Sequence, residues 1–187
     1  MEIGVWNAWL FMVIFPLQWL VVLVIPKHII VEKTSHSADL KQYRKGKVMS
    51  RINATFWAGA TLYSIFLPLD IGMTWFHIGL GVFVIGLVVL ISATVSVSRT
   101  PADEPFIGGV YRFSRHPMYL SMIFVYTGVS IATASWLFLL ITMITFFLQR
   151  FQIIQEEEYC CAKFGCSYCD YMERTPRWLG IPKQDNM

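Results

Sequence analysis

Charged residues are scarce in this 187-residue chain, which is 14% charged, 56% hydrophobic and 16% aromatic. In a typical globular protein, roughly a quarter of the residues are Asp, Glu, Lys or Arg. A chain of this size that folds in water has a large surface to cover with polar groups, and this chain lacks them. The composition therefore excludes a cytosolic enzyme, a disordered chain and a nucleic-acid-binding module, and it indicates a membrane protein.

Cysteine is also rare, and its four copies all fall between residues 160 and 169. The spacing Cys160-Cys161-x4-Cys166-x2-Cys169 differs from a structural zinc site, which usually has two separated knuckles. We therefore expect no metal, with zinc as the alternative. On the cytoplasmic side of a membrane, the default state of these thiols is reduced.

Long charge-free runs dominate the rest of the chain. A bilayer core about 30 Å thick needs roughly 20 apolar residues in a helix, and runs of that order cover 3–25, 52–69, 71–97 and 117–149. The fourth run has 33 residues, which is too long for one crossing with modest tilt. We divide it at the polar stretch 132–135, with one long tilted helix as the alternative. The pattern predicts an all-α, polytopic membrane protein with about five transmembrane helices.

The placement of the positive charges predicts the topology. All fifteen Lys and Arg residues lie in three segments, with seven in 27–51, three in 99–115 and five in 150–183. Five crossings put these segments on one side of the membrane and leave only Glu2 and Asp70 on the other. Because positively charged loops favour the cytoplasm, we expect the N-terminus outside and the C-terminus in the cytoplasm.

We expect two parts in the chain, with three transmembrane helices and a basic cytoplasmic loop in 1–98 and a helical hairpin with a cytoplasmic tail in 99–187. The basic loop, 27–51, is either an orientation signal or a surface for anionic lipid headgroups. Three glycines of the third run indicate close helix packing; they are Gly79, Gly81 and Gly86.

A polar motif leads into the fourth run, with the sequence Tyr111-Arg112-Phe113-Ser114-Arg115-His116-Pro117-Met118-Tyr119. Pro117 suits the first helical position, because its missing N–H would have no partner there. His116 then lies at the helix cap, beside free backbone N–H groups and the positive end of the helix dipole. Arg115 adds a fixed charge. This corner is suited to hold an anion; anchoring of the helix at the headgroups is the alternative.

A second polar motif, Glu156-Glu157-Glu158, follows the charge-free run. We expect this helix to continue to Phe164 and to stop at Gly165. Neighbours on a helix point about 100° apart, so one carboxylate can face a cleft while the next pairs with an arginine. A solvated acidic face is the alternative. Arg150 is the last cation at the membrane boundary, where simple snorkelling would also explain it.

Together these motifs resemble a known family. Tyr111-Arg112-x2-Arg115-His116-Pro117-x-Tyr119 and, later, Glu156-Glu157-x6-Phe164-Gly165-x2-Tyr168-x2-Tyr171 are similar to the isoprenylcysteine carboxyl methyltransferases and their phospholipid methyltransferase relatives. The terminal Thr175-Pro176-Arg177 also fits that pattern. The resemblance covers residues 106–180, and the first three helices match only in number and character.

The resemblance implies an integral membrane enzyme that uses S-adenosylmethionine in a pocket facing the cytoplasm. The cofactor-binding residues it implies are Tyr111, Arg115, His116, Tyr119, Glu156 and Glu157. It also implies catalytic roles for Arg150 and Glu156. The chain departs from the family at Ser121, where many members have Gly, and at Gln152, where some have a basic residue.

The expected chemistry suits these residue types. Methyl transfer from a sulfonium is an in-line displacement, so the protein supplies positioning and electrostatics rather than a nucleophile. A glutamate can accept hydrogen bonds from the cofactor's ammonium or ribose hydroxyls. A carboxylate acceptor would need a cation such as Arg150, whereas an amine would need a group to take its proton.

The first acceptor that we expect is the carboxylate of a prenylated cysteine. A phospholipid amine or a thiol is the alternative, and a non-catalytic membrane scaffold or lipid-binding protein is a second one. The expected partners are thus a lipophilic acceptor and the bilayer. Fold-level analogy alone does not decide between these acceptors.

Overall fold

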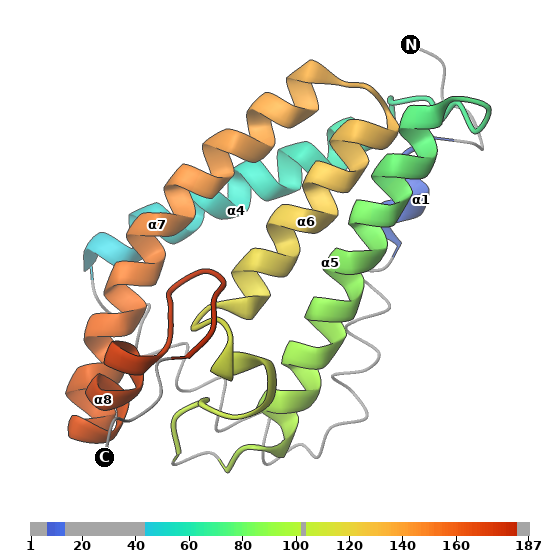
Figure 1. Cartoon of the computed structure of the whole chain (residues 1–187). Helices are drawn as coiled ribbons and strands as arrows, with labels where there is room; N and C mark the ends of the chain where they lie inside the picture. Colours follow the sequence, from blue (N-terminus) through green and yellow to red (C-terminus); the bar gives the residue numbers. More distant parts are fainter. Residues whose placement is uncertain (1–6, 14–43, 102–103, 183–187) are drawn as a thin grey trace.

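A computed structural model describes residues 7–13, 44–101 and 104–182, with the side chains of 44–50 left out. Within these ranges every regular element is a helix, and the backbone pairs in β fashion only at an isolated bridge between Asn7 and Pro68. The predicted all-α class is confirmed (Figure 1). The elements are α1 (Trp9–Met12), α4 (Arg44–Ser64), α5 (Thr74–Arg99), the 3-10 helix η1 (Gly109–Arg112), α6 (Pro117–Ala132), α7 (Trp136–Phe164) and α8 (Cys166–Arg174).

Two of the described helices, α5 with 26 residues and α7 with 29, are long and apolar enough to cross a bilayer. Helix α5 covers the predicted span 71–97 almost completely. Both helices expose large apolar side chains, which are Val84, Ile85, Val88 and Ile91 on α5 and Leu137, Leu140, Met143 and Phe147 on α7. Contiguous apolar surface of this kind is rare on a soluble protein and suits contact with lipid.

The predicted second span, 52–69, differs from the helix observed. Helix α4 begins inside the basic segment at Arg44 and ends at Ser64, so only its last 13 residues, 52–64, are charge-free. Helix α6 is apolar but has 16 residues, about 24 Å of helix, which is shorter than the bilayer core. The first predicted span, 3–25, lies mostly outside the described residues. The count of five crossings therefore stays a prediction, as does the division of the chain at residue 98.

The predicted break in the fourth charge-free run is confirmed. Helix α6 ends at Ala132 and α7 begins at Trp136. Ala134 adopts a left-handed conformation with φ of 48°, and the Ser135 side chain accepts a hydrogen bond from the Phe138 N–H at 3.3 Å. This cap satisfies one of the unpaired donors at the start of α7. The alternative of one long helix is therefore wrong.

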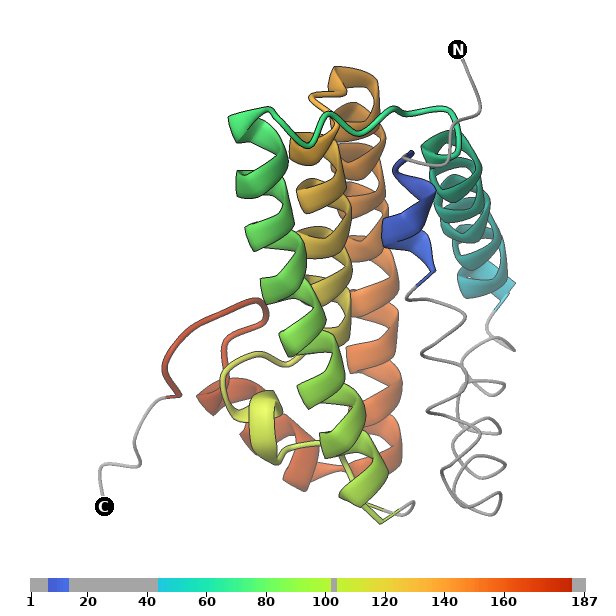
Figure 2. The same ribbon diagram turned by 90° about the vertical axis from the view of Figure 1, so that its right-hand side faces the viewer.

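Close packing between α5 and α6 depends on glycine, as predicted for two of the three positions. A Cβ at Gly79 would lie 2.3 Å from the Ala132 backbone nitrogen, and one at Gly86 would lie 2.8 Å from that of Val125. Gly81 meets nothing within 4 Å, so the prediction was wrong there. Figure 2 shows α5, α6 and α7 side by side; α4 packs directly against α7, and α1 lies beside α4.

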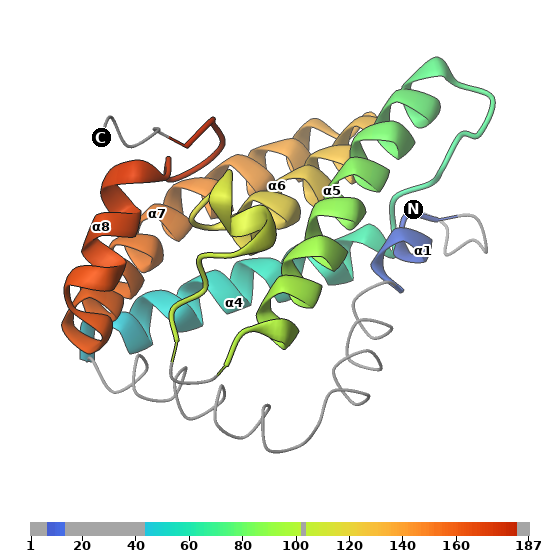
Figure 3. The same ribbon diagram turned by 60° about the horizontal axis from the view of Figure 1, so that its bottom comes forward.

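Aromatic contacts fill the space between α1, α4, α5, α6 and α7. The rings of Phe11 and Phe83 are 4.6 Å apart between centroids, and those of Trp57 and Tyr126 are 4.1 Å apart. The connections gather at the two ends of the bundle. The α4–α5 turn lies at one end, where the Gly72 N–H donates to Asp70 Oδ1 at 3.2 Å. At the other end, η1, the start of α6 and α8 lie together (Figure 3).

Candidate active site

The two predicted polar motifs meet at the end of the bundle that holds α8. Pro117 is the first residue of α6 and His116 is its cap, as predicted. Helix α7 continues to Phe164 and stops at Gly165, whose φ is 62°, so Glu156 and Glu157 lie two turns before its end. The Ser114 hydroxyl accepts a hydrogen bond from the His116 N–H at 3.2 Å, which orients the start of α6. His116 thereby faces the two glutamates of α7.

Glu157 is the centre of a buried ion cluster. The carboxylate oxygen Oε1 lies 3.1 Å from His116 Nε2, 3.2 Å from an Arg115 guanidinium nitrogen and 3.2 Å from Arg177 Nε. The second oxygen, Oε2, accepts a hydrogen bond from Arg177 at 2.6 Å. The residue is 4% exposed. These contacts engage both oxygens, so Glu157 holds three basic side chains from two distant segments in place.

Glu156, its neighbour, has a different environment. The Tyr119 hydroxyl lies close to its carboxylate, and the buried oxygen Oε2 has no hydrogen-bond partner. This oxygen is 3.9 Å from His116 Nδ1, too far for a hydrogen bond. Since His116 contacts Glu157 through Nε2, Nδ1 is the ring nitrogen that lies toward Glu156. Oε2 of Glu156 is therefore a buried acceptor without a hydrogen-bond partner in the described residues.

The C-terminal segment, residues 175–182, fastens the first motif to α7. The Arg115 N–H donates to the Pro176 carbonyl at 3.1 Å, and the Gly180 N–H donates to the Phe113 carbonyl at 3.0 Å. The Tyr171 hydroxyl on α8 donates to the Tyr111 carbonyl at 2.6 Å. These bonds bring Arg177 to Glu157.

The tyrosines in this layer are neutral hydrogen-bonding groups. Burial, reinforced by the negative charge of Glu156, raises the pKa of Tyr111 far above its ordinary value. Burial likewise raises the pKa values of Tyr168 and Tyr171, although Arg115 counteracts this for Tyr171. All three hydroxyls therefore keep their protons across the physiological pH range.

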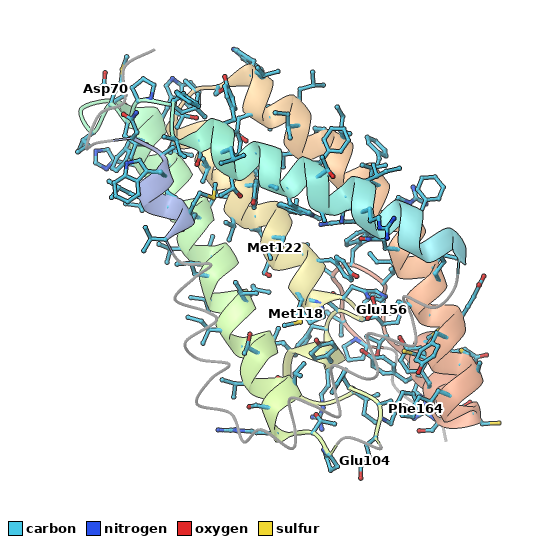
Figure 4. All side chains as sticks on the ribbon, turned by 180° about the vertical axis from the view of Figure 1, so that it is seen from behind. Asp70, Glu104, Met118, Met122, Glu156 and Phe164 are labelled. Atoms are coloured by element: carbon cyan, nitrogen blue, oxygen red, sulfur yellow. The ribbon has the colours of Figure 1, made fainter. Side chains whose placement is uncertain are left out.

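An apolar cavity of about 450 Å³ lies next to the cluster. Its walls are Met12, Trp57, Ala58, Thr61, Leu90, Met118, Tyr119, Met122, Tyr126 and Gln149. Figure 4 shows Met118 and Met122 along α6, with Glu156 at the Met118 end. Tyr119 belongs to the cavity wall and also lies beside His116 of the cluster, with ring centroids 5.8 Å apart. Among the described residues, Tyr119 therefore connects the polar cluster to the apolar cavity.

Gln149 is a buried polar side chain in this wall. It is 1% exposed, and its Oε1 atom has no hydrogen-bond partner. A buried, unpaired carbonyl oxygen costs about 1–3 kcal/mol unless a ligand or water supplies a donor. The next residue, Arg150, has an exposed side chain and does not line the cavity. The structure therefore brings together six of the seven predicted site residues and leaves Arg150 apart from them.

The family model described as phospholipid methyltransferase matches residues 71–166, about half of the chain, and includes both polar motifs. The chain belongs to the phospholipid methyltransferase family. This is a family of integral membrane methyltransferases that includes the isoprenylcysteine methyltransferases. No curated protein matches the chain.

The features that sequence reasoning missed in this family member lie partly beyond the matched residues. Arg177 was noted only as part of a terminal motif, yet it makes two hydrogen bonds to Glu157. The signal was the Thr175-Pro176-Arg177 pattern itself. The sequence did not predict a role for Gln149 in the site, because a single glutamine at the end of an apolar run is expected at the boundary of a membrane span. In the described part of the chain, no three His, Cys, Asp or Glu side chains form a group that could hold a metal.

Proposed function

We propose that this family member transfers a methyl group from S-adenosylmethionine to a lipophilic acceptor. The observation that supports this most directly is the buried, unpaired Glu156 oxygen beside His116, next to Tyr119, which also lines the apolar cavity. A methyltransferase for lipids needs such a junction, because its donor is polar and its acceptor is apolar.

The residues present fit the cofactor. Glu156 Oε2 is a buried, unpaired acceptor that an ammonium group would satisfy. The Tyr119 ring lies beside that of His116, with centroids 5.8 Å apart, and Glu157 holds His116 in its orientation. When bound, the cofactor would supply an electrophilic methyl group. The chain's own residues would fix its ammonium and keep the methyl carbon in line with the acceptor.

The acceptor's hydrocarbon chain would occupy the cavity, with its reacting group beside Tyr119. A cavity of this size and lining is typical of a site for a lipophilic ligand. A prenylated cysteine carboxylate is the first candidate. As a carboxylate it needs no base, and Arg150, which is exposed and one position after Gln149, would hold it with a charge-assisted hydrogen bond only if its side chain turned toward the cavity.

A phospholipid amine is the second candidate, and Gln149 favours it. The unpaired Oε1 of Gln149 would accept a hydrogen bond from an N–H in the cavity, and none of the described residues that line the cavity carries a formal charge to hold a carboxylate. An amine must lose a proton during transfer, and Glu156 is the carboxylate that would receive it. A thiol acceptor would also fit, because its S–H is a weak donor that would bond to the same Gln149 oxygen.

A labelled-methyl assay with two substitutions separates these candidates. Arg150→Gln should lower activity on a prenylcysteine carboxylate at least about tenfold, with cofactor binding intact, because it removes a charge-assisted contact. Gln149→Leu should leave that activity high but raise the KM for an amine lipid. Arg99→Gln, which removes an exposed cation at the C-terminal end of α5, is the control.

The outcomes decide the proposal as well as the acceptor. Full activity of Arg150→Gln on a prenylcysteine carboxylate would remove Arg150 from the site. Methylation of an amine lipid by the parent protein, with none on the carboxylate, would promote the second candidate. A parent protein that binds no S-adenosylmethionine would contradict the proposal altogether and favour a membrane scaffold.

A further inference from the structure

Two of the four cysteines lie in contact across the junction between α7 and α8. Gly165 ends α7 and turns the chain into α8 with a φ of 62°, which folds the first turn of α8 back on the last turn of α7. Cys169 Sγ consequently lies 2.9 Å from Cys161 Sγ. A disulfide bond is about 2.05 Å long, so the two sulfur atoms need approach by only about 0.9 Å to bond.

The other two cysteines have different environments. Cys160 is buried and Cys166 is exposed, whereas Cys161 and Cys169 are both partly accessible. Partial access lets a small oxidant reach the pair, and contact between the sulfurs lets the second thiol complete the reaction. Met172 Sδ, 3.7 Å from Cys161 Sγ, adds a third sulfur that packs against the pair.

We propose that Cys161 and Cys169 form a reversible oxidation site that closes to an intramolecular disulfide. With a low-molecular-weight disulfide such as oxidised glutathione, one cysteine thiolate attacks a glutathione sulfur and expels the first glutathione thiolate. The second cysteine thiolate then attacks the protein sulfur of this mixed disulfide and expels the other. The protein loses two electrons and two protons, and one disulfide becomes two molecules of reduced glutathione.

The disulfide would control how firmly the C-terminal segment is fastened to the ion cluster. Cys161 lies one turn after Glu157 on α7, and Cys169 precedes Tyr171, whose hydroxyl bonds to the Tyr111 carbonyl. Oxidation would therefore tie α8 covalently to the helix that carries Glu157 and restrain the segment that supplies Arg177. The oxidation site itself does not depend on the proposed methyl transfer, whereas its effect on turnover does.

A peptide map of the full-length protein in detergent tests the site directly. The purified protein is treated with oxidised glutathione at mildly alkaline pH, its remaining thiols are alkylated, and it is cleaved with trypsin. Cleavage after Arg150, Lys163 and Arg174 separates peptide 151–163, which holds Cys160 and Cys161, from peptide 164–174, which holds Cys166 and Cys169. A disulfide between Cys161 and Cys169 links the two peptides and lowers their summed mass by two hydrogen atoms.

We expect the linked peptides to exceed any internally bridged peptide by at least about tenfold, because only one pair is in contact. Cys161→Ser and Cys169→Ser should each abolish the link, whereas Cys166→Ser should retain it. Reduction should restore both free peptides. In the oxidised protein, residues 166–182 should exchange backbone hydrogens more slowly than in the reduced protein.

Three results would overturn the proposal, and the parent protein alone provides the first two. One is glutathione that stays attached to Cys161 and Cys169 as separate mixed disulfides. Another is a bridge within peptide 164–174 as the main product. The third is a link that survives Cys169→Ser but not Cys166→Ser. None of these outcomes depends on methyl transfer, so failure of the oxidation site and failure of the proposed function are distinguishable.

Discussion

Adjacent glutamates on α7 should respond in opposite ways to the same isosteric substitution. Glu157→Gln removes the negative charge to which Arg115, His116 and Arg177 are bound. Removal of one partner from a buried ion pair costs about 3–5 kcal/mol, because Arg115, whose side chain is 11% exposed, stays largely buried without a counter-charge. In a protein of 150–250 residues, 1 kcal/mol shifts Tm by about 2–4 °C, so we expect Tm to fall by roughly 6–20 °C.

Glu156→Gln should instead leave stability nearly unchanged. The oxygen Oε2 of Glu156 has no hydrogen-bond partner in the folded protein, so little is lost when the carboxylate becomes an amide. If this oxygen holds the cofactor's ammonium, loss of the charge-assisted bond costs about 1.5–3 kcal/mol, or roughly a tenfold to hundredfold loss of affinity. The two variants differ by one position, so each is the control for the other.

The measurements are thermal unfolding of detergent-purified protein at one scan rate and equilibrium binding of S-adenosylmethionine. A fixed scan rate matters, because membrane proteins that unfold irreversibly give a Tm that depends on it. Equal Tm values for the two variants would refute the assignment of Glu157 to the ion cluster. Unchanged cofactor affinity in Glu156→Gln would refute the role of its open oxygen.

Two further predictions follow from the helix arrangement. In a background without the other cysteines, native Cys166 and an introduced Asp70→Cys should react with an impermeant thiol reagent from opposite sides of the membrane. They lie at opposite ends of the bundle, and positive charge favours the cytoplasm. Labelling of both cysteines from one side would contradict the topology. Gly79→Ala should lower stability by about 1–3 kcal/mol, because the added Cβ would clash with the backbone of α6. Gly81 faces open space, so Gly81→Ala should leave stability unchanged. Equal Tm values for the two variants would contradict the packing of α5 on α6.

Local features of this protein could be predicted from the sequence because each depends on a few neighbouring residues. The charge-free run 71–97 was long enough to require a helix in lipid, and α5 occupies it. Pro117 could begin a helix and Gly165 could end one for reasons of backbone geometry alone. The break at 132–135 followed from the length of the run. The spacing of the two polar motifs indicated membership of a methyltransferase family.

Prediction was weaker where burial on one side of a helix decides the outcome. The second span, 52–69, was placed by hydrophobicity alone, but α4 begins earlier and ends at Ser64, where the chain turns toward α5. From the sequence, Gly79 and Gly81 were both predicted to allow close helix packing. Only the first faces α6, because residues two apart on a helix point in nearly opposite directions.

The tertiary structure decided which of the predicted site residues act together. Glu156 and Glu157 are equivalent in sequence, yet one is fully engaged by three basic groups and the other keeps an oxygen open. The difference arises because the C-terminal segment folds back and brings Arg177 from 20 residues away to Glu157. Gln149 and Arg150 are distinguished in the same way, since one faces the cavity and the other faces outward. Such choices depend on contacts between distant segments, which a local pattern of residues does not specify.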